Sequence, residues 1–474
     1  MTAQVACAGT LVAFLMAATA VAQPDIPLPR PADEPLGEAP WYETDKRPVL
    51  PPIEQTLGVD PSNFSANVET FVRGYRFVGN TVFTDDELSV LTAAYSGRNV
   101  TALELETLRQ LISAQYVQHG YINSGAIYPD QDLADQIVTV QIIEGRLARV
   151  ETTGDERLPN RYLVAQVEAD DGPLNIRDLE QRLRSIERNP LISSVNAELR
   201  PGPTAGTGTL LLNVREAKPY WFEMAVDNSR APSVGEWQGL GRFTHYNLLG
   251  FADMLTAEIG VTDGLVDGFF NYRMPLLPRH SIDIGYRRTN GDVVEEPFED
   301  LDIKSTTDTW RFGTFHTLRD TLSSTVNLAF RLEGRKTKTE LLGMPFSFSP
   351  GAEDGVYRVT ALRAVQDLSW RAQRQALGFR STLSFGLDAF NATAHQGGIE
   401  DGQFVSWLGQ ASWGYRFLES GLEIAARADL QLSNNPLLPV EQFAIGGDYS
   451  VRGYRRNQLI RDQGFVASVE ARVP

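Results

Sequence analysis

The chain has 474 residues, of which 42% are hydrophobic, and a formal net charge of −17. This length allows two or three domains, and the negative charge argues against a nucleic-acid partner because phosphate binding needs a dominant basic face. Cys7 is the only cysteine, which excludes a disulfide scaffold and a cysteine-ligated metal site.

The N-terminus predicts an export signal. Val5 to Ala20 is apolar, and Ala20-Val21-Ala22 has the small residues of a cleavage site. No Lys or Arg precedes the apolar run, so an apolar tail that is not secreted remains the alternative. We expect a signal peptide at 1–22, followed at 23–67 by a linker that its prolines keep extended.

A mixed unit is predicted at 68–146. Strand-like Phe71–Val78 precedes two capping boxes, Thr84 with Glu87 and Thr101 with Glu104. The second box opens a helix with one apolar face, and two strands follow it, near Ile122–Tyr128 and Ile137–Ile143. The predicted order of elements is βααββ.

The same order repeats at 147–218. Gly154 lies 75 residues after Gly79, its counterpart at the end of the first strand of the first unit. Internal repetition at this scale indicates a modular binding arm. Each unit is expected to expose a strand edge beside a helix, an arrangement that accepts an extended peptide by strand addition.

Beyond Lys218-Pro219 the period becomes an alternation of apolar and polar residues. Apolar Leu255, Ala257, Ile259 and Val261, for example, alternate with small or polar residues. A soluble sandwich also alternates, but strands of about ten residues, aromatic residues at strand ends and alternating short and long connections favour a transmembrane barrel. We predict an antiparallel transmembrane β-barrel at 219–474, with about twelve strands and a hydrated lumen.

One stretch near the C-terminus has the composition of a shaped loop. Gly446, Gly447 and Gly453 permit tight turns around Arg452. The alternative is a glycine-rich surface loop with no special function. The candidate functional residues are the tip motif and its supporting glycines: Val451, Arg452, Gly453, Tyr454, Gly446 and Gly447.

The sequence offers little for an enzyme. Its five histidines lack metal-ligand spacing, and no G-x-S-x-G or phosphate-binding Gly-Lys-Ser/Thr motif occurs. Carboxylates in the barrel strands are more simply explained as charges that face the lumen. We therefore predict no catalytic residues, no cofactor and no metal.

Motifs spread along the chain resemble those of two-partner secretion transporters, the haemolysin and haemagglutinin secretion/activation family of the Omp85 superfamily. The matching residues of the first POTRA domain are Gly79-Asn80-Thr81, Phe83, Gly120-Tyr121, Pro129, Gln131 and Ile143-Glu144-Gly145. Those of the exit from the second POTRA domain and of the first periplasmic turn are Asn213-Val214, Glu216, Lys218-Pro219, Asn247, Gly250 and Asp253. Phe443, Gly446-Gly447 and Val451-Arg452-Gly453-Tyr454 resemble the family's long loop, whose tip folds back into the lumen.

The resemblance implies a protein of the Gram-negative outer membrane with two periplasmic POTRA domains. These would capture a large secreted exoprotein as an extended chain, and the barrel would pass that chain to the surface without nucleotide. Other expected partners are outer-membrane lipid and the periplasmic chaperones and barrel-assembly machinery that insert the barrel itself. Arg452 would fix the inward loop, placed at 431–462, through a charge-assisted bond to an acidic residue on a following strand.

The sequence departs from the family pattern after this loop. Only one strand follows it before Pro474, so we expect a C-terminally truncated barrel that lacks the acidic partner of Arg452. Two other functions stay open. One is a barrel-assembly insertase of the same superfamily, although two POTRA units rather than more argue against it. The other is a passive outer-membrane channel, for which a POTRA arm would have no purpose.

Overall fold

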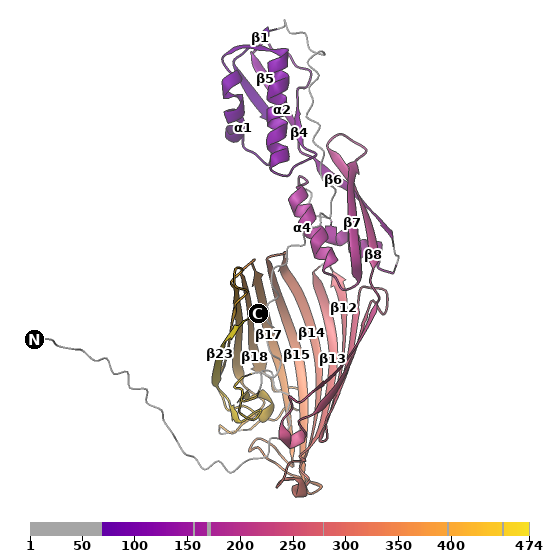
Figure 1. Ribbon diagram of the computed structural model, residues 1–474, viewed down its shortest axis with the longest axis vertical. Helices are drawn as coiled ribbons and strands as arrows, with labels where there is room; N and C mark the ends of the chain where they lie inside the picture. The colour runs from indigo at the N-terminus through magenta and orange to yellow at the C-terminus, as the bar shows by residue number, and fades with distance from the viewer. Residues whose placement is uncertain are drawn as a thin grey trace, which may run out of the picture.

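The computed structural model describes residues 69–154, 157–167, 172–277, 279–395, 398–447 and 450–473. Two helical units lie beyond one end of a long, curved sheet (Figure 1). The signal peptide and linker predicted at 1–22 and 23–67 lie outside the described residues. Among the helices of the described ranges, none is long and apolar enough to cross a membrane.

The first unit contains a three-stranded sheet covered by helices. Its elements are β1 (Glu69–Val72), β2 (Gly74–Val78), α1 (Asp85–Thr92), η3 (Ala93–Tyr95), β3 (Arg98–Thr101), α2 (Ala102–Gln118), β4 (Gly125–Ile127) and β5 (Ile137–Ile143). The sheet order is β2-β5-β4, with β2 parallel and β4 antiparallel to β5. The predicted βααββ order is confirmed, with a small β1–β3 pair as an unpredicted addition.

Local chemistry explains where the helices of this unit begin. Both predicted capping boxes are present, because Thr84 and Thr101 each accept a bond from the backbone N–H of a glutamate three residues later and that glutamate bonds back. The apolar face of α2 supplies the core through Leu108, Ile112 and Tyr116, all fully buried. Helix α2 therefore begins at a capped residue and is held by the burial of its apolar face.

The second unit repeats this arrangement. Its elements are β6 (Arg146–Gly154), α3 (Asn160–Val167), α4 (Ile176–Glu187), β7 (Ile192–Pro201) and β8 (Thr207–Glu216). The sheet order is β6-β8-β7, with β6 parallel and β7 antiparallel to β8. Helix α4 buries Leu179, Leu183 and Ile186, as its periodicity predicted.

Two glycines occupy the same place in the two units. Gly79 follows β2 and Gly154 ends β6, and both have positive φ, 90° and 118°. A Cβ at Gly79 would press on the carbonyl oxygen of Ile142, and one at Gly154 on that of Val214. The shared conformation and contact support the internal repeat.

The large sheet has twelve strands in one antiparallel path, as predicted, and a short hairpin strand, β16 (Met344–Pro345). The path contains β9 (Tyr220–Asp227), β10 (Gln238–Tyr246), β11 (Met254–Val261), β12 (Leu265–Leu277), β13 (His280–Asp292), β14 (Lys304–Asp320), β15 (Ser324–Leu341), β17 (Val356–Arg371), β18 (Gln375–Gly386), β19 (Val405–Arg416), β20 (Glu423–Ser433) and β23 (Gly464–Arg472). Its edge strands are β9 and β23.

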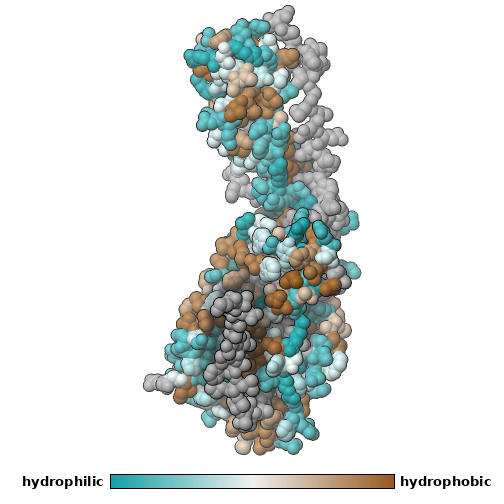
Figure 2. All heavy atoms as spheres, turned by 60° about the vertical axis from the view of Figure 1, so that its left-hand side comes forward, coloured by the Kyte–Doolittle hydropathy of each residue, from teal (hydrophilic) through white to brown (hydrophobic). Residues whose placement is uncertain are grey.

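The two faces of this sheet differ in chemistry. Cross-strand partners share a face, so the pairing of Arg311 with Glu333, Arg331 with Arg363, and Asp367 with Arg380 places charges on one face. The other face carries exposed apolar side chains, and apolar surface recurs over the sheet (Figure 2): examples are Phe222, Met224, Ile259, Phe270, Ile284, Phe312, Phe330, Leu368 and Val469. An apolar outer face and a charged inner face are those of a membrane barrel.

Candidate functional site: a segment folded into the sheet

Residues 434–463, here called the inward segment, connect β20 to β23. The segment contains η6 (Pro439–Glu441) and a hairpin in which β21 (Phe443–Ile445) pairs antiparallel with β22 (Leu459–Arg461). The predicted bounds were 431–462, but β20 continues to Ser433 and β23 starts at Gly464. The segment touches the sheet at its tip and at its base, and the two contacts differ in chemistry.

At the tip, the predicted glycines take conformations that favour glycine. Gly446, Gly447 and Gly453 have φ of 125°, 88° and 86°. A Cβ at Gly446 would press on the carbonyl oxygen of Arg455, whereas one at Gly453 would meet open space. Of the other motif residues, Val451 is half-buried and Tyr454 is exposed.

Arg452 has an acidic partner, contrary to the sequence-based prediction. Its Nη2 donates to Glu470 Oε1 at 2.6 Å, and Glu470 lies on β23, the strand that follows the inward segment. Glu470 is on the charged face of the sheet because it is paired in register with Ala425, two residues from lumen-facing Arg427. The prediction failed because it expected the partner on a strand beyond Pro474.

Other arginines of the tip reach the opposite edge of the sheet. Arg455 Nη1 donates to Glu295 Oε1 at 2.6 Å, and Arg456 Nη1 donates to the Ser229 carbonyl at 3.5 Å. Ser229 lies in the connection between β9 and β10, and Glu295 in that between β13 and β14. The tip thus contacts β23 on one side and the loops near β9 on the other.

At the base, the inward segment is buried against the inner face of β17. Leu437, Leu438 and Val440 are fully buried and pack with Tyr357 and Val359 of that strand, in a cluster completed by Ala361 and Phe404. Asp462 joins the two limbs of the segment, because its Oδ1 accepts bonds from Leu437 N and Gln442 Nε2, each at 3.0 Å. The apolar side chains of the base are therefore buried between the segment and the sheet.

A buried charge network lies beside this apolar cluster. Glu441 Oε1 accepts from Arg363 Nη2 at 2.7 Å, and the same nitrogen donates to Glu333 Oε1 at 3.1 Å. Arg335 bonds Glu333 at 2.7 Å through Nε and the Val440 carbonyl at 2.9 Å through Nη1. Arg311 Nε lies 3.4 Å from Glu333 Oε2. The inward segment thus supplies one carboxylate, that of Glu441, to a cluster of arginines on the inner face of the sheet, here called the wall.

Sequence reasoning did not find this network. The sequence feature that could have indicated the network is the single charged residue Glu441 directly after the apolar run Leu437 to Val440. The arginines sit at inward positions of β14, β15 and β17, where alternation predicts polar residues but not their partners. Only the folded sheet brings Arg363 and Arg335 to Glu441, which lies 78 and 106 residues further along the chain.

The second unit docks on the end of the sheet. Arg188 Nη2 lies 3.1 Å from Asp320 Oδ1, and Asn247 Nδ2 donates to the Arg157 carbonyl at 2.7 Å. A pocket of about 540 Å³ lies between this unit and the sheet, lined by Tyr162, Gln166, Arg188, Met254, Arg273 and Asp320 among others. The motif residues Asn247 and Asp253 thus shape the turn that holds the second unit.

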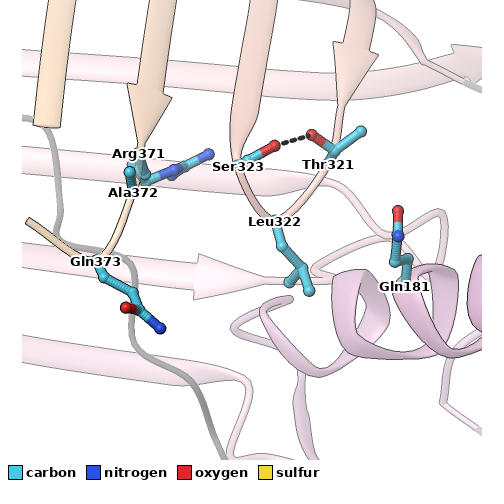
Figure 3. Close-up of a pocket in the computed structure, with 7 residues that line it drawn as sticks. All are labelled: Gln181, Thr321, Leu322, Ser323, Arg371, Ala372 and Gln373. Carbon is cyan, nitrogen blue, oxygen red and sulfur yellow. Dashed lines mark hydrogen bonds between the residues drawn. The ribbon is translucent and has the colours of Figure 1, made fainter. Parts of the chain in front are cut away.

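A second pocket, of about 320 Å³, lies beside the first. Gln181 of α4 faces the turn between β14 and β15, and the side chain of Leu322 points towards the helix (Figure 3). Arg371, Ala372 and Gln373 of the next turn form the other side. Most of the residues that line this pocket are polar.

The two units are joined end to end through their helices. Asn175, the N-cap of α4, accepts from Arg177 N at 3.0 Å through its Oδ1 and donates to the His119 carbonyl at 3.0 Å through Nδ2. Ile176 N donates to the Gly120 carbonyl at 2.9 Å. Carbonyls that would stay unpaired at the end of α2 are thereby satisfied by the start of α4. This contact fixes the direction of one unit relative to the other.

The POTRA motif residues of the first unit form an internal clamp. Glu144 accepts from Thr81 N at 2.6 Å, Val82 N at 2.8 Å and the Tyr116 hydroxyl at 3.0 Å. Burial acts to raise the pKa of Glu144, but the hydrogen bond from the Thr81 hydroxyl, together with those from Val82 N, Thr81 N and the Tyr116 hydroxyl, outweighs it and lowers the pKa from its ordinary value. Glu144 and the Gly79 turn are therefore structural residues.

Among the described residues, no group of three or more His, Cys, Asp or Glu side chains is placed to hold a metal ion.

A curved sheet with an apolar outer face, a charged inner face, a segment folded inside and βααββ units at one end defines an outer-membrane barrel protein with a POTRA arm. Comparison with known families narrows the class. The chain belongs to the haemolysin secretion/activation protein family ShlB/FhaC/HecB, whose model matches residues 206–474, and the ShlB-type POTRA model matches residues 70–145. It is an outer-membrane transporter with its POTRA units in the periplasm.

Individual relatives agree with this assignment. The chain is 26% identical over 409 residues to the outer membrane transporter CdiB of Dickeya dadantii, a match that covers 83% of this chain and 70% of the relative. It is 27% identical over 403 residues to CdiB of Escherichia coli O6:K15:H31, which covers 81% of this chain and 66% of the relative. The heme/hemopexin transporter HuxB of Haemophilus influenzae is 23% identical over 183 residues, 38% of this chain and 32% of the relative.

Solved structures show the same fold. CdiB from Escherichia coli superposes with a TM-score of 0.66 at 23% identity, covering 88% of this chain and 78% of that structure. CdiB from Acinetobacter baumannii gives a TM-score of 0.59 at 14% identity, covering 86% of this chain and 77% of that structure. Because both identities are below 25%, these superpositions show the fold alone.

Proposed function

We propose that this chain is a non-enzymatic transporter that takes a large secreted exoprotein from its POTRA units and passes it, extended, through the barrel lumen. The proposal rests on how the parts of the molecule follow one another. The two units, whose sheets have strand edges, lie at one end of the large sheet, and two pockets lie where the second unit meets it. From there the charged inner face of the sheet, which the inward segment occupies, leads on. Membrane lipid outside, and periplasmic chaperones with the barrel-assembly machinery during insertion, complete the proposed partners.

The receptor step is assigned to the first unit. Among the described residues, the strands at the edges of its sheet are β2 and β4, each with one neighbour, β5. Helix α1 contacts β2 and helix α2 contacts β4, so each edge lies beside a helix. Val78 on β2 and Ile127 on β4 are exposed apolar residues. An extended peptide can add a strand to such an edge through backbone hydrogen bonds and place alternate side chains against the helix.

Site-specific photocrosslinking tests this step. A photoreactive amino acid at Val78 or Ile127 should crosslink to the exoprotein, whereas the same group at Val90, an exposed residue of α1, is the matched control. A crosslink from only one of the two strands would identify the edge that is used. Strand addition would be contradicted if neither Val78 nor Ile127 crosslinked, or if Val90 crosslinked as strongly as they do.

Secretion in a heterologous host tests the function as a whole. The exoprotein is expressed with and without this chain, and its amount in the medium is measured. Export that depends on the chain, and is lost when 71–143 is deleted, supports the transporter. Depletion of many outer-membrane proteins in the chain's absence would favour an insertase, and bilayer conductance without any effect on secretion would favour a passive channel.

A further inference from the structure

We propose that Glu441, rather than Arg452, is the residue that keeps the inward segment inside the sheet, with Arg363 and Arg335 as its receptor on the wall. Its purpose, to hold the lumen closed until an exoprotein arrives, rests on the proposed function. The proposal concerns a positioning residue, since Glu441 acts through the segment that bears the Arg452 motif.

The two contacts that the inward segment makes with the sheet differ in burial. The side chains of Glu441 and Arg363 are 1% and 5% exposed, whereas those of Arg452 and Glu470 are 69% and 31% exposed. Water and salt screen an exposed pair, and many such pairs contribute little. A buried charge that loses its partner is left without compensation, so the loss of one member has a large effect. The two contacts of the segment are therefore unequal.

Several hydrogen bonds converge on η6, the short helix that contains Glu441. Besides its salt bridge with Arg363, Glu441 offers its backbone carbonyl to Gln431 Nε2 at 2.9 Å. Arg335 donates to the neighbouring Val440 carbonyl at 2.9 Å. Strands β15, β17 and β20 thus all hold one short helix. Because these bonds form together, the base should leave the wall as one unit.

If Glu441 left the wall, the balance of charge there would change. Glu333 contacts three guanidinium groups, those of Arg311, Arg335 and Arg363. With Glu441 in place, two carboxylates face these three cations, and without it Glu333 alone remains. Release therefore requires that other acceptors reach the arginines. A polypeptide in the lumen supplies them as backbone carbonyls and carboxylates, so an incoming chain can compete with Glu441 for the wall.

Thiol labelling measures whether the base has left the wall. The reporter is Val440→Cys in a Cys7→Ser background, because Val440 is fully buried and its contact with Arg335 uses only the backbone. The purified full chain is reconstituted in lipid vesicles and treated with a bulky, membrane-impermeant maleimide. A cysteine at the exposed turn residue Ser323 serves as the reactivity standard, and heat-modifiable migration in SDS gels reports an assembled barrel.

Glu441→Gln, which keeps the shape but removes the charge, should raise the labelling rate of the reporter by about tenfold or more, and Glu441→Ala by at least as much. Arg452→Ala should change it by less than about threefold. If Glu441→Ala does not assemble, Arg363→Lys provides the second variant, because lysine keeps the charge but not the paired contacts to Glu441 and Glu333.

Two results would overturn the proposal. One is labelling at the parent rate in the assembled glutamine and lysine variants, and the other is an Arg452→Ala variant that labels as fast as Glu441→Gln. No exoprotein is present in the assay, so its outcome does not depend on secretion. If the labelling rates were as expected but the chain exported no exoprotein, the result would count against the proposed function alone.

Discussion

Arg452 and Glu470 form a 2.6 Å ion pair between the tip of the inward segment and the charged face of the next strand. The glycine-rich stretch is therefore more than a surface loop, since its central arginine meets a carboxylate on the barrel wall. Arg472 also approaches Glu470, at 3.3 Å, which places the carboxylate between two guanidinium groups.

Replacing Arg452 by Ala should lower exoprotein secretion several-fold while the barrel still inserts. Because the pair is exposed, the free energy of unfolding should change by less than about 1 kcal/mol. Secretion and heat-modifiable migration are the two measurements. The exchange Arg452→Glu with Glu470→Arg should restore part of the lost secretion. Arg461→Ala is the control, because within the described part of the chain the Arg461 side chain donates only to the carbonyl of its neighbour, Ile460. Unchanged secretion in Arg452→Ala would remove the tip from the mechanism.

Much of the fold could be predicted from local patterns. Alternation in strands such as β11 follows from one face in lipid and one in water, and the capping boxes at Thr84 and Thr101 mark helix starts from four residues each. Strand ends were harder to predict. The polar residues from Lys336 belong to β15, which continues to Leu341 because it pairs with β17 as far as Lys338 and with β16 at Glu340 and Leu341.

The partners in the site could not be predicted in the same way. The motif gave the position of Arg452, but the identity of its partner depends on which face of β23 turns inward. Glu441 and Arg363 are 78 residues apart, and no local pattern relates them. Spacing predicts which residues face the lumen, whereas the path of the inward segment decides which of them meet.

Glu144→Gln should destabilise the first unit, and the effect should depend on pH. The pKa of Glu144 is lowered in the folded chain, so its carboxylate stabilises the fold above the unfolded value, 4.5, and this contribution is lost as the pH falls through the folded value. We expect a loss of about 1–3 kcal/mol at pH 7 and a smaller difference from the parent near pH 4.

Hydrogen exchange of the backbone amides in 69–143 measures this loss in the full chain. Glu69→Gln is the control, because Glu69 is an exposed carboxylate of the same unit. A destabilisation by Glu144→Gln that is equally large at both pH values would show that the carboxylate charge is not what the turn requires.

Asn175→Ala should loosen the junction between the two POTRA units. The side chain caps α4 and also binds the end of α2, so its removal loses an N-cap, about 1 kcal/mol, and a contact between units. Distances between spin labels, one on each unit, should become more broadly distributed. Thr84→Ala removes a cap within the first unit alone, and this control should leave the distribution narrow. Equal broadening in both variants would refute the junction's role.

Alanine at either repeated glycine should destabilise its own unit. Gly79 and Gly154 combine positive φ with a carbonyl oxygen in the space of a Cβ, and backbone strain of this kind alone costs about 1–3 kcal/mol. Gly74 offers the contrast, because a Cβ there meets nothing within 4 Å and its φ is not in the left-handed region. Hydrogen exchange should therefore accelerate in the first unit for Gly79→Ala, in the second for Gly154→Ala and in neither for Gly74→Ala. If Gly154→Ala left the second unit as protected as Gly74→Ala leaves the first, the two glycines would not be equivalent, and the structural argument for the repeat would fall with them.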